Sequence, residues 1–143
     1  MTNEMHRWGF GDPGPVRDEL TALALAGTKT TTASLLIDFE MEGETLPVVG
    51  QRDLMIDTDE RPVAIVENVS CRVVRLGDVD DQHAIDEGEG YTNAAEFRVT
   101  HEAYWNRYLD AYREHLRDPD WVLTDDTLVV LERFRIVERL DGA

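Results

Sequence analysis

A single lysine beside a run of threonines is a combination that suits nucleophilic catalysis. The segment Gly27-Thr-Lys29-Thr-Thr-Thr32 places Lys29 three residues before Thr32. If the segment forms a turn, both side chains lie on one side and the amine can approach the Thr32 hydroxyl. A lysine with a lowered pKa can act as general base for a threonine nucleophile. The alternative is a surface lysine near a helix C-terminus, where a cation is favourable. A phosphate-binding loop is excluded, because the pattern G-x-x-x-x-G-K-[ST] is absent.

An acidic loop with alternating glycines, Asp86-Glu87-Gly-Glu89-Gly90, is the second candidate for chemistry. Glycines let a backbone approach a ligand closely, and a carboxylate placed there can serve as general acid or base. A solvated acidic turn is the alternative interpretation of the same residues.

Two aromatic residues near the N-terminus, Trp8 and Phe10, lie among glycines and follow no helical or strand period. Each therefore either covers the core or forms one wall of a pocket.

The last β-rich segment contributes a carboxylate and a basic strip. Glu132 shares a predicted strand face with Phe134 and Ile136, where a carboxylate needs a partner or a role. The opposite face carries Arg133, Arg135 and Arg139, which form either an exposed sheet face or a local site for phosphate.

The residue types that bind metals or form disulfides are scattered. The single cysteine, Cys71, excludes an intramolecular disulfide and a thiolate cluster. We expect no metal and no cofactor, because no H-x-x-x-H pair occurs among the four histidines, His6, His83, His101 and His115.

The composition limits the class of protein. The 143 residues suit one domain spanning 1–143, with 1–14 as an N-terminal loop. Fourteen basic residues, of which only Lys29 is a lysine, against thirty acidic ones give a net charge of −16, which argues against broad nucleic-acid binding. A signal peptide and a membrane-spanning run are both absent from the sequence, so we expect a cytoplasmic protein, either monomer or homodimer.

The pattern of helix and strand signals predicts an α+β domain, with a small curled sheet or barrel and helices outside it. Residues 38–46 carry no assignable pattern. We expect helices over 15–26 and 93–117, a short helix at the start of 78–90, a strand or turn over 30–37, and strands over 53–57, 63–76 and 127–139.

Several of these segments together resemble the ASCH domain family across nearly the whole chain. The resemblance rests on the G-x-K-x-x-T element from Gly27 to Thr32, on the acidic loop 86–90 and on Glu132-Arg-Phe-Arg135. It also includes Trp8-Gly-Phe-Gly-Asp12 and the segment 98–105.

The resemblance implies a small β-barrel similar to the PUA domain, flanked by helices that form a cleft against one barrel face. Small bacterial members are amidohydrolases that remove the acyl group from N4-acylated cytidines with a lysine, a threonine and a glutamate. These positions match Lys29, Thr32 and Glu87. This chain is longer, and Ala33-Ser34 stands where those proteins carry a hydrophobic residue and an arginine.

The resulting hypothesis is a hydrolase acting on an acylated nucleoside or related small amide, with the substrate contacted by Trp8, Phe10, Ser34, Glu132 and Arg133. In one mechanism a near-neutral Lys29 deprotonates Thr32, Thr32 attacks the acyl carbon and Glu87 protonates the departing amine. In the other, Lys29 stays charged and stabilises the oxyanion, with Glu87 as the base.

Two alternatives from other classes stay open. The first is a non-catalytic RNA- or nucleotide-binding module that uses the arginine strip, and the second is a ribonuclease. No histidine pair has a spacing suited to acid–base attack on RNA.

Overall fold

A curled mixed sheet is the centre of the fold. The computed structural model describes residues 5–140, and in this range five strands lie in the order β1-β3-β4-β5-β2. β1 pairs parallel with β3, and the other pairs are antiparallel. The strands are β1 Arg7–Trp8, β2 Thr31–Leu35, β3 Arg52–Ile56, β4 Pro62–Arg75 and β5 Leu128–Arg139.

The barrel expected from the resemblance is an open sheet in the described part of the chain. β1 and β2 are its two edges, and no pairing among residues 5–140 joins them. Both edges border the same cleft, which is lined by Trp8 of β1 and by Thr32, Ala33 and Ser34 of β2. The cleft therefore occupies the gap where a barrel would close.

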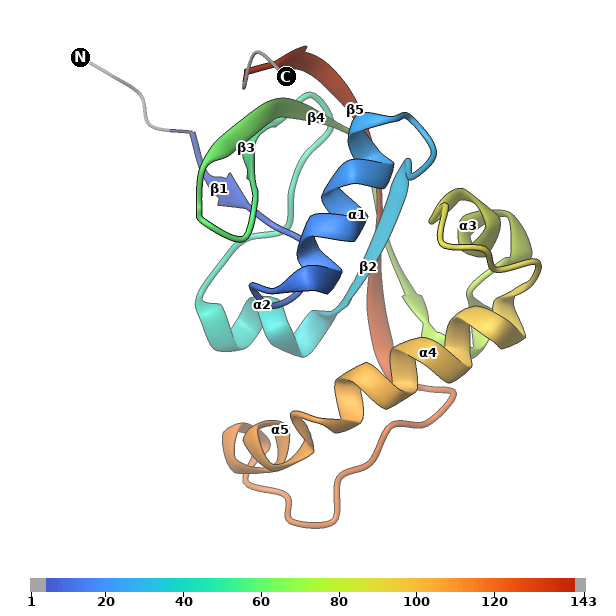
Figure 1. The fold of residues 1–143 in the computed structure, drawn as a ribbon. Helices are drawn as coiled ribbons and strands as arrows, with labels where there is room; N and C mark the ends of the chain where they lie inside the picture. The colour runs from blue at the N-terminus through green and yellow to red at the C-terminus, as the bar shows by residue number, and fades with distance from the viewer. Residues whose placement is uncertain (1–4, 141–143) are drawn as a thin grey trace.

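Five α-helices surround the sheet within residues 5–140, which confirms the α+β class. Figure 1 shows α1 in front of the strands and α4 and α5 together at the lower end of the molecule. The helices are α1 Pro15–Leu25, α2 Leu36–Glu42, α3 Asp81–Asp86, α4 Ala94–Asn106 and α5 Leu109–Leu116, with a 3₁₀ turn at Leu76–Asp78.

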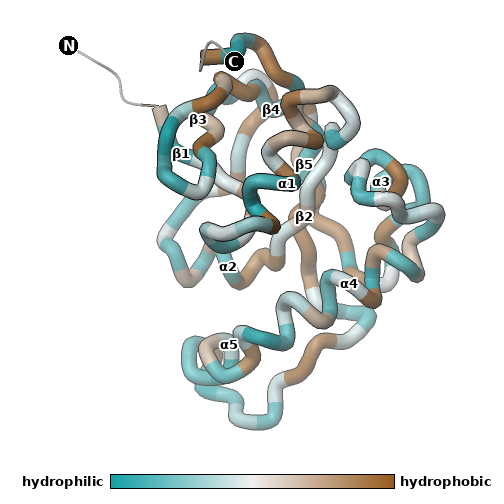
Figure 2. The backbone as a smooth tube through the Cα atoms, viewed as in Figure 1, coloured by the Kyte–Doolittle hydropathy of each residue, from teal (hydrophilic) through white to brown (hydrophobic). Residues whose placement is uncertain are grey.

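The sheet is covered by an apolar cluster on each face. Val129 and Leu131 of β5 belong to one cluster, which includes Phe97, Trp105 and other residues of the helices α2 to α5. The side chain of Phe134, of opposite parity on the same strand, packs in the second cluster with α1. Figure 2 shows hydrophobic residues gathered along the central strands. Burial on both faces explains why β5 is apolar at 129–131 without alternation.

Some predicted elements differ from those in the structure. The predicted helix 93–117 is two helices, α4 and α5, separated at Arg107 and Tyr108, where neither glycine nor proline marks the break. The strand or turn predicted over 30–37 is a strand that ends at Leu35, because α2 begins at the next residue. The predicted N-terminal loop contains β1, while residues 1–4 lie outside the described part of the chain, as do 141–143 of the predicted domain.

No helix among residues 5–140 is long and apolar enough to cross a membrane.

Candidate active site

The turn between α1 and β2 positions Lys29. After α1 ends, the backbone amides of Thr28 and Lys29 both donate to the Leu23 carbonyl, at 3.0 and 3.1 Å. Gly27 supplies the positive φ of 81° that this reversal requires. The next amide, that of Thr30, donates to the Asp86 carbonyl at 2.9 Å, which fixes the start of β2 against the end of α3.

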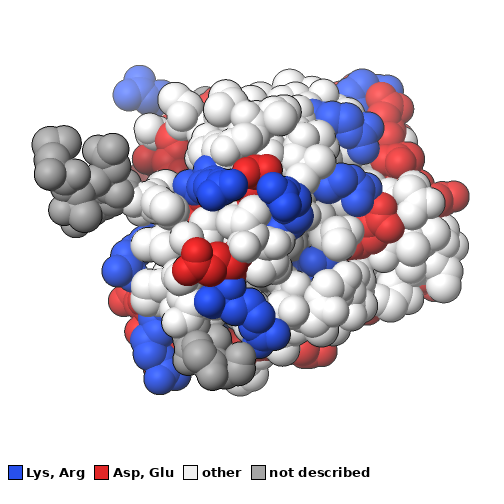
Figure 3. All heavy atoms as spheres, turned by 90° about the horizontal axis from the view of Figure 1, so that it is seen from above, with Lys and Arg blue, Asp and Glu red and all other residues white. Residues whose placement is uncertain are grey.

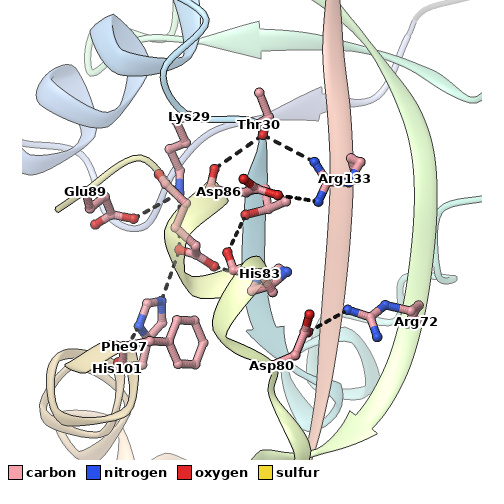
Figure 4. A network of polar contacts seen from close by, with 12 residues as sticks. Lys29, Thr30, Arg72, Asp80, His83, Asp86, Glu89, Phe97, His101 and Arg133 are labelled. Atoms are coloured by element: carbon pink, nitrogen blue, oxygen red, sulfur yellow. Dashed lines mark hydrogen bonds and ion pairs between the residues drawn. The ribbon is translucent and has the colours of Figure 1, made fainter. Parts of the chain in front are cut away.

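The Lys29 side chain is buried among carboxylates rather than exposed, and only 2% of the residue is accessible. Its Nζ donates to Glu87 Oε1 at 3.2 Å, to the Glu87 carbonyl at 3.2 Å and to Glu89 Oε2 at 2.9 Å. Figure 4 shows Lys29 and Glu89 pointing toward each other. The Phe10 ring lies 5.3 Å from Nζ. Three oxygen acceptors match the three hydrogens of a charged ammonium group.

Glu87, at the end of α3, is the second buried member of this cluster and is only 1% exposed. Its Oε2 lies 2.8 Å from Nε2 of His83 on α3, and its Oε1 lies 3.5 Å from Nε2 of His101 on α4. Burial alone would raise the pKa of Glu87, but the Lys29 charge and the hydrogen bonds of the two histidines outweigh it and hold this pKa well below its usual range. The Glu87 carboxylate is therefore ionised and fully partnered at neutral pH.

Glu89 is the more accessible partner of Lys29, with 20% of its side chain exposed. Burial raises the pKa of Glu89, and the neighbouring Glu87 adds to the increase, while the Lys29 charge opposes it. Glu89 is thus more open to the cleft than Glu87, the other carboxylate partner of Lys29.

Thr32 lies where two lobes of the cleft meet. It lines both the large lobe, of about 870 Å³, and the small lobe, of about 320 Å³. Lys29, Glu87 and Glu89 line the small lobe. The predicted trio therefore shares one cavity, although in the described part of the chain no hydrogen bond joins Lys29 to Thr32.

The other predicted contact residues fall into two groups. Trp8, Ser34 and Glu132 line the large lobe, and Phe10 lines both lobes. Phe10 is also a core residue, 4.7 Å from the Trp8 ring between centroids, so the two aromatics cover the core and wall the cleft at once.

Arg133 points away from the cleft. Its Nη2 lies 2.6 Å from Asp86 Oδ2, and Arg135 pairs with Glu67 at 3.1 Å. Figure 3 shows basic side chains gathered on one face of the molecule with acidic side chains among them. The positive charge of Arg133 and Arg135 is thus balanced locally by carboxylates.

Glu89, His83 and His101 belong to the site and were absent from the predicted set. The spacing of His83 and Glu87, four residues apart on a short helix, is a signal that sequence inspection can detect. His101 carries no such signal, because α4 brings it to Glu87 through tertiary packing. Among the residues that the structure describes, no three His, Cys, Asp or Glu side chains come together in a way that could hold a metal ion.

Comparisons with known proteins agree with this architecture. The family model of the ASCH domain matches residues 6–138. A crystal structure of a DUF984 protein from Enterococcus faecalis V583 is similar, with 27% identity and a TM-score of 0.78, covering 94% of this chain and 77% of that one. The ASCH domain from Lactobacillus crispatus JV V101 is similar too, with 25% identity and a TM-score of 0.78, covering 94% and 80%. No match was found among curated proteins.

Proposed function

The chain belongs to the ASCH domain family, and from that premise we propose that it is a hydrolase that removes an acyl group from an N4-acylated cytidine or a related small amide. The observation that carries the proposal is the buried Lys29 in a cavity that Thr32 also lines. Burial of a cation is energetically costly, so a buried lysine in a cavity that a threonine hydroxyl also lines supports a functional role.

The hydrogen bonds of Lys29 favour the mechanism in which this residue stays charged. Glu87 and Glu89 surround Nζ with oxygen acceptors, and both carboxylates stabilise the ammonium form. A charged Lys29 cannot deprotonate Thr32. It can instead stabilise the oxyanion that forms when the Thr32 hydroxyl oxygen adds to the acyl carbon.

In this mechanism Glu87 holds the Lys29 side chain in position and does not donate a proton. Its low pKa leaves it without a proton at neutral pH, and His83 and Lys29 occupy its oxygens. Its role in the proposal is to orient Nζ, while the more exposed Glu89 is the partner that a substrate carbonyl oxygen replaces.

The test is incubation of the protein with N4-acetylcytidine and, separately, with a structured RNA, alongside Lys29→Ala and Thr32→Ala variants. We expect cytidine and acetate from the wild-type protein, and a loss of about 10²–10³-fold in kcat for Lys29→Ala, the size typical of a lost oxyanion donor. Deacylation that survives both substitutions would contradict the mechanism. RNA binding or cleavage without deacylation would instead favour one of the two RNA alternatives.

A further inference from the structure

Glu132 occupies a position in the cleft that the proposed mechanism has not used. It lies on β5 directly opposite Thr32 of β2 in the antiparallel pairing. Directly opposed residues project from the same face of a sheet, with Cβ atoms about 4.5–5.5 Å apart. Both residues line the large lobe, so the Glu132 carboxyl group is a neighbour of the Thr32 hydroxyl.

Glu132 is largely buried, but its carboxyl group has no partner and keeps contact with the cleft. The residue is 8% exposed and lines the large lobe, and among residues 5–140 its carboxyl group forms no hydrogen bond or ion pair. Buried carboxyl groups are normally paired, because desolvation of an isolated charge is unfavourable. A group in this state, facing a cavity of about 870 Å³, has its oxygens available to a ligand.

The two lobes differ in the half of an amide that they suit. The small lobe combines Lys29 with an apolar wall from α1 and the loop before it, which suits a carbonyl oxygen and its acyl chain. The large lobe is lined by Glu132 and by aromatic side chains, among them Trp8 and Tyr108, which suit an amino-substituted ring. In a substrate bound in this way, with Thr32 at the junction, the scissile C–N bond would span the two lobes.

Building on the proposed function, we propose that Glu132 is the proton carrier of the reaction. Its carboxylate takes the proton of the Thr32 hydroxyl as the threonine oxygen bonds to the acyl carbon. The resulting carboxylic acid gives that proton to the nitrogen as the C–N bond breaks, so the amine leaves neutral and the acyl group stays on Thr32. Glu132 then takes a proton from a water molecule that attacks the acyl carbon, and returns it to the Thr32 oxygen as the ester bond breaks.

The electrostatic surroundings of Glu132 suit a group that gains and loses a proton near neutrality. Burial raises the pKa of Glu132 to about 7, with a further increase from Asp53 and a small opposing effect from His6. Cys71 of β4, the partner of Glu132 on its other side, is a further titratable neighbour, and its own raised pKa keeps it neutral. A general base works best when its pKa lies close to the operating pH.

The experiment compares the pH profile of kcat/KM for wild-type protein and Glu132→Gln with N4-acetylcytidine as substrate. For the wild type we expect kcat/KM to rise about tenfold per pH unit below pH 7 and to level off above it, as the carboxylate form accumulates. For Glu132→Gln we expect a loss of about 10²–10⁴-fold, and the rise below pH 7 should be absent. Glu138→Gln, on the exposed end of the same strand, is the matched control and should retain the wild-type profile.

The outcomes separate this role from the proposed function. Turnover by the wild type with an unchanged profile in Glu132→Gln would overturn the role of Glu132 and leave the proposed function standing. A loss of turnover in Glu132→Gln with the rise below pH 7 retained would show a positioning role and would also overturn proton transfer. Absence of turnover by the wild type would overturn both.

Discussion

Replacing Glu132 by glutamine should stabilise the protein in neutral and alkaline solution, although the same change should remove activity. The ordinary pKa of the carboxyl group is 4.5, and burial raises it to about 7 in the folded protein. The folded state therefore binds the proton more tightly than the unfolded state between these values. Stability falls as pH rises from 4.5 to 7, and above pH 7 the full penalty of a buried carboxylate is present. The pKa difference corresponds to about 3 kcal/mol.

Glutamine has nearly the shape of a protonated glutamic acid but cannot ionise, so Glu132→Gln removes this penalty. At pH 8 we expect a gain of up to about 3 kcal/mol in the free energy of unfolding, or roughly 10 °C in Tm. At pH 4 the two proteins should be equally stable. Urea unfolding of wild type, Glu132→Gln and the exposed control Glu138→Gln at both pH values measures these differences. A variant that is less stable than wild type at pH 8, or a difference that does not change with pH, would refute the reasoning.

Three further changes test the surroundings of Lys29. Gly88→Ala should destabilise the fold by about 1–3 kcal/mol more than Gly90→Ala in urea unfolding, because both glycines have positive φ but only a Cβ at 88 would meet backbone, 2.8 Å from Lys29 Cα. Glu87→Gln should lower the unfolding free energy at pH 7 by about 3–5 kcal/mol, because it leaves the Lys29 ammonium with Glu89 as its one carboxylate. That difference should shrink as pH falls below 4.5, since the low pKa of Glu87 makes its contribution depend on the ionised form. Arg133→Gln should leave kcat/KM for N4-acetylcytidine unchanged, because Arg133 lies outside the cleft and pairs with Asp86.

Local signals were sufficient to predict much of the fold. Pro15 near the start and Gly27 after the end of a short apolar period predict α1, and the structure begins and ends that helix within one residue of the expectation. Asn93 followed by Glu96 is the pattern of a capping box, and Asn93 Oδ1 accepts from the Glu96 amide at 2.9 Å. In that pattern the N3 side chain returns to the N-cap amide, whereas here the Glu96 side chain accepts from the Thr92 amide, one residue earlier. Helix ends and capping contacts, which involve residues within four positions of one another, are therefore predicted to within one residue.

Contacts made by tertiary packing were beyond reach of the same signals. The spacing of Lys29 and Thr32 predicted that the amine approaches the hydroxyl. In the structure the two residues line one cavity, but the partners of Lys29 Nζ are Glu87 and Glu89, from a loop almost sixty residues later. From the sequence that loop is either a solvated acidic turn or a loop whose carboxylate serves as general acid or base, and neither interpretation includes an ion pair with Lys29. The choice between them depends on the close approach of the loop to the α1–β2 turn at Gly88, which only the fold reveals.

Two largely buried glutamates in one cleft have pKa values shifted in opposite directions, and that contrast supports the roles proposed for them. Glu87 and Glu132 are both almost inaccessible, so desolvation acts on each in the same direction. Glu87 has a lysine and two histidines against it, and its pKa falls, whereas Glu132 has no such partner and its pKa rises to about 7. A carboxylate that keeps its charge can hold Lys29 in place, and a carboxyl group that titrates near neutrality can carry a proton. Because Thr32 lies at the junction of the lobes that these two residues line, the proposed mechanism places its nucleophile between the Lys29 ammonium on one side and the proposed proton carrier Glu132 on the other.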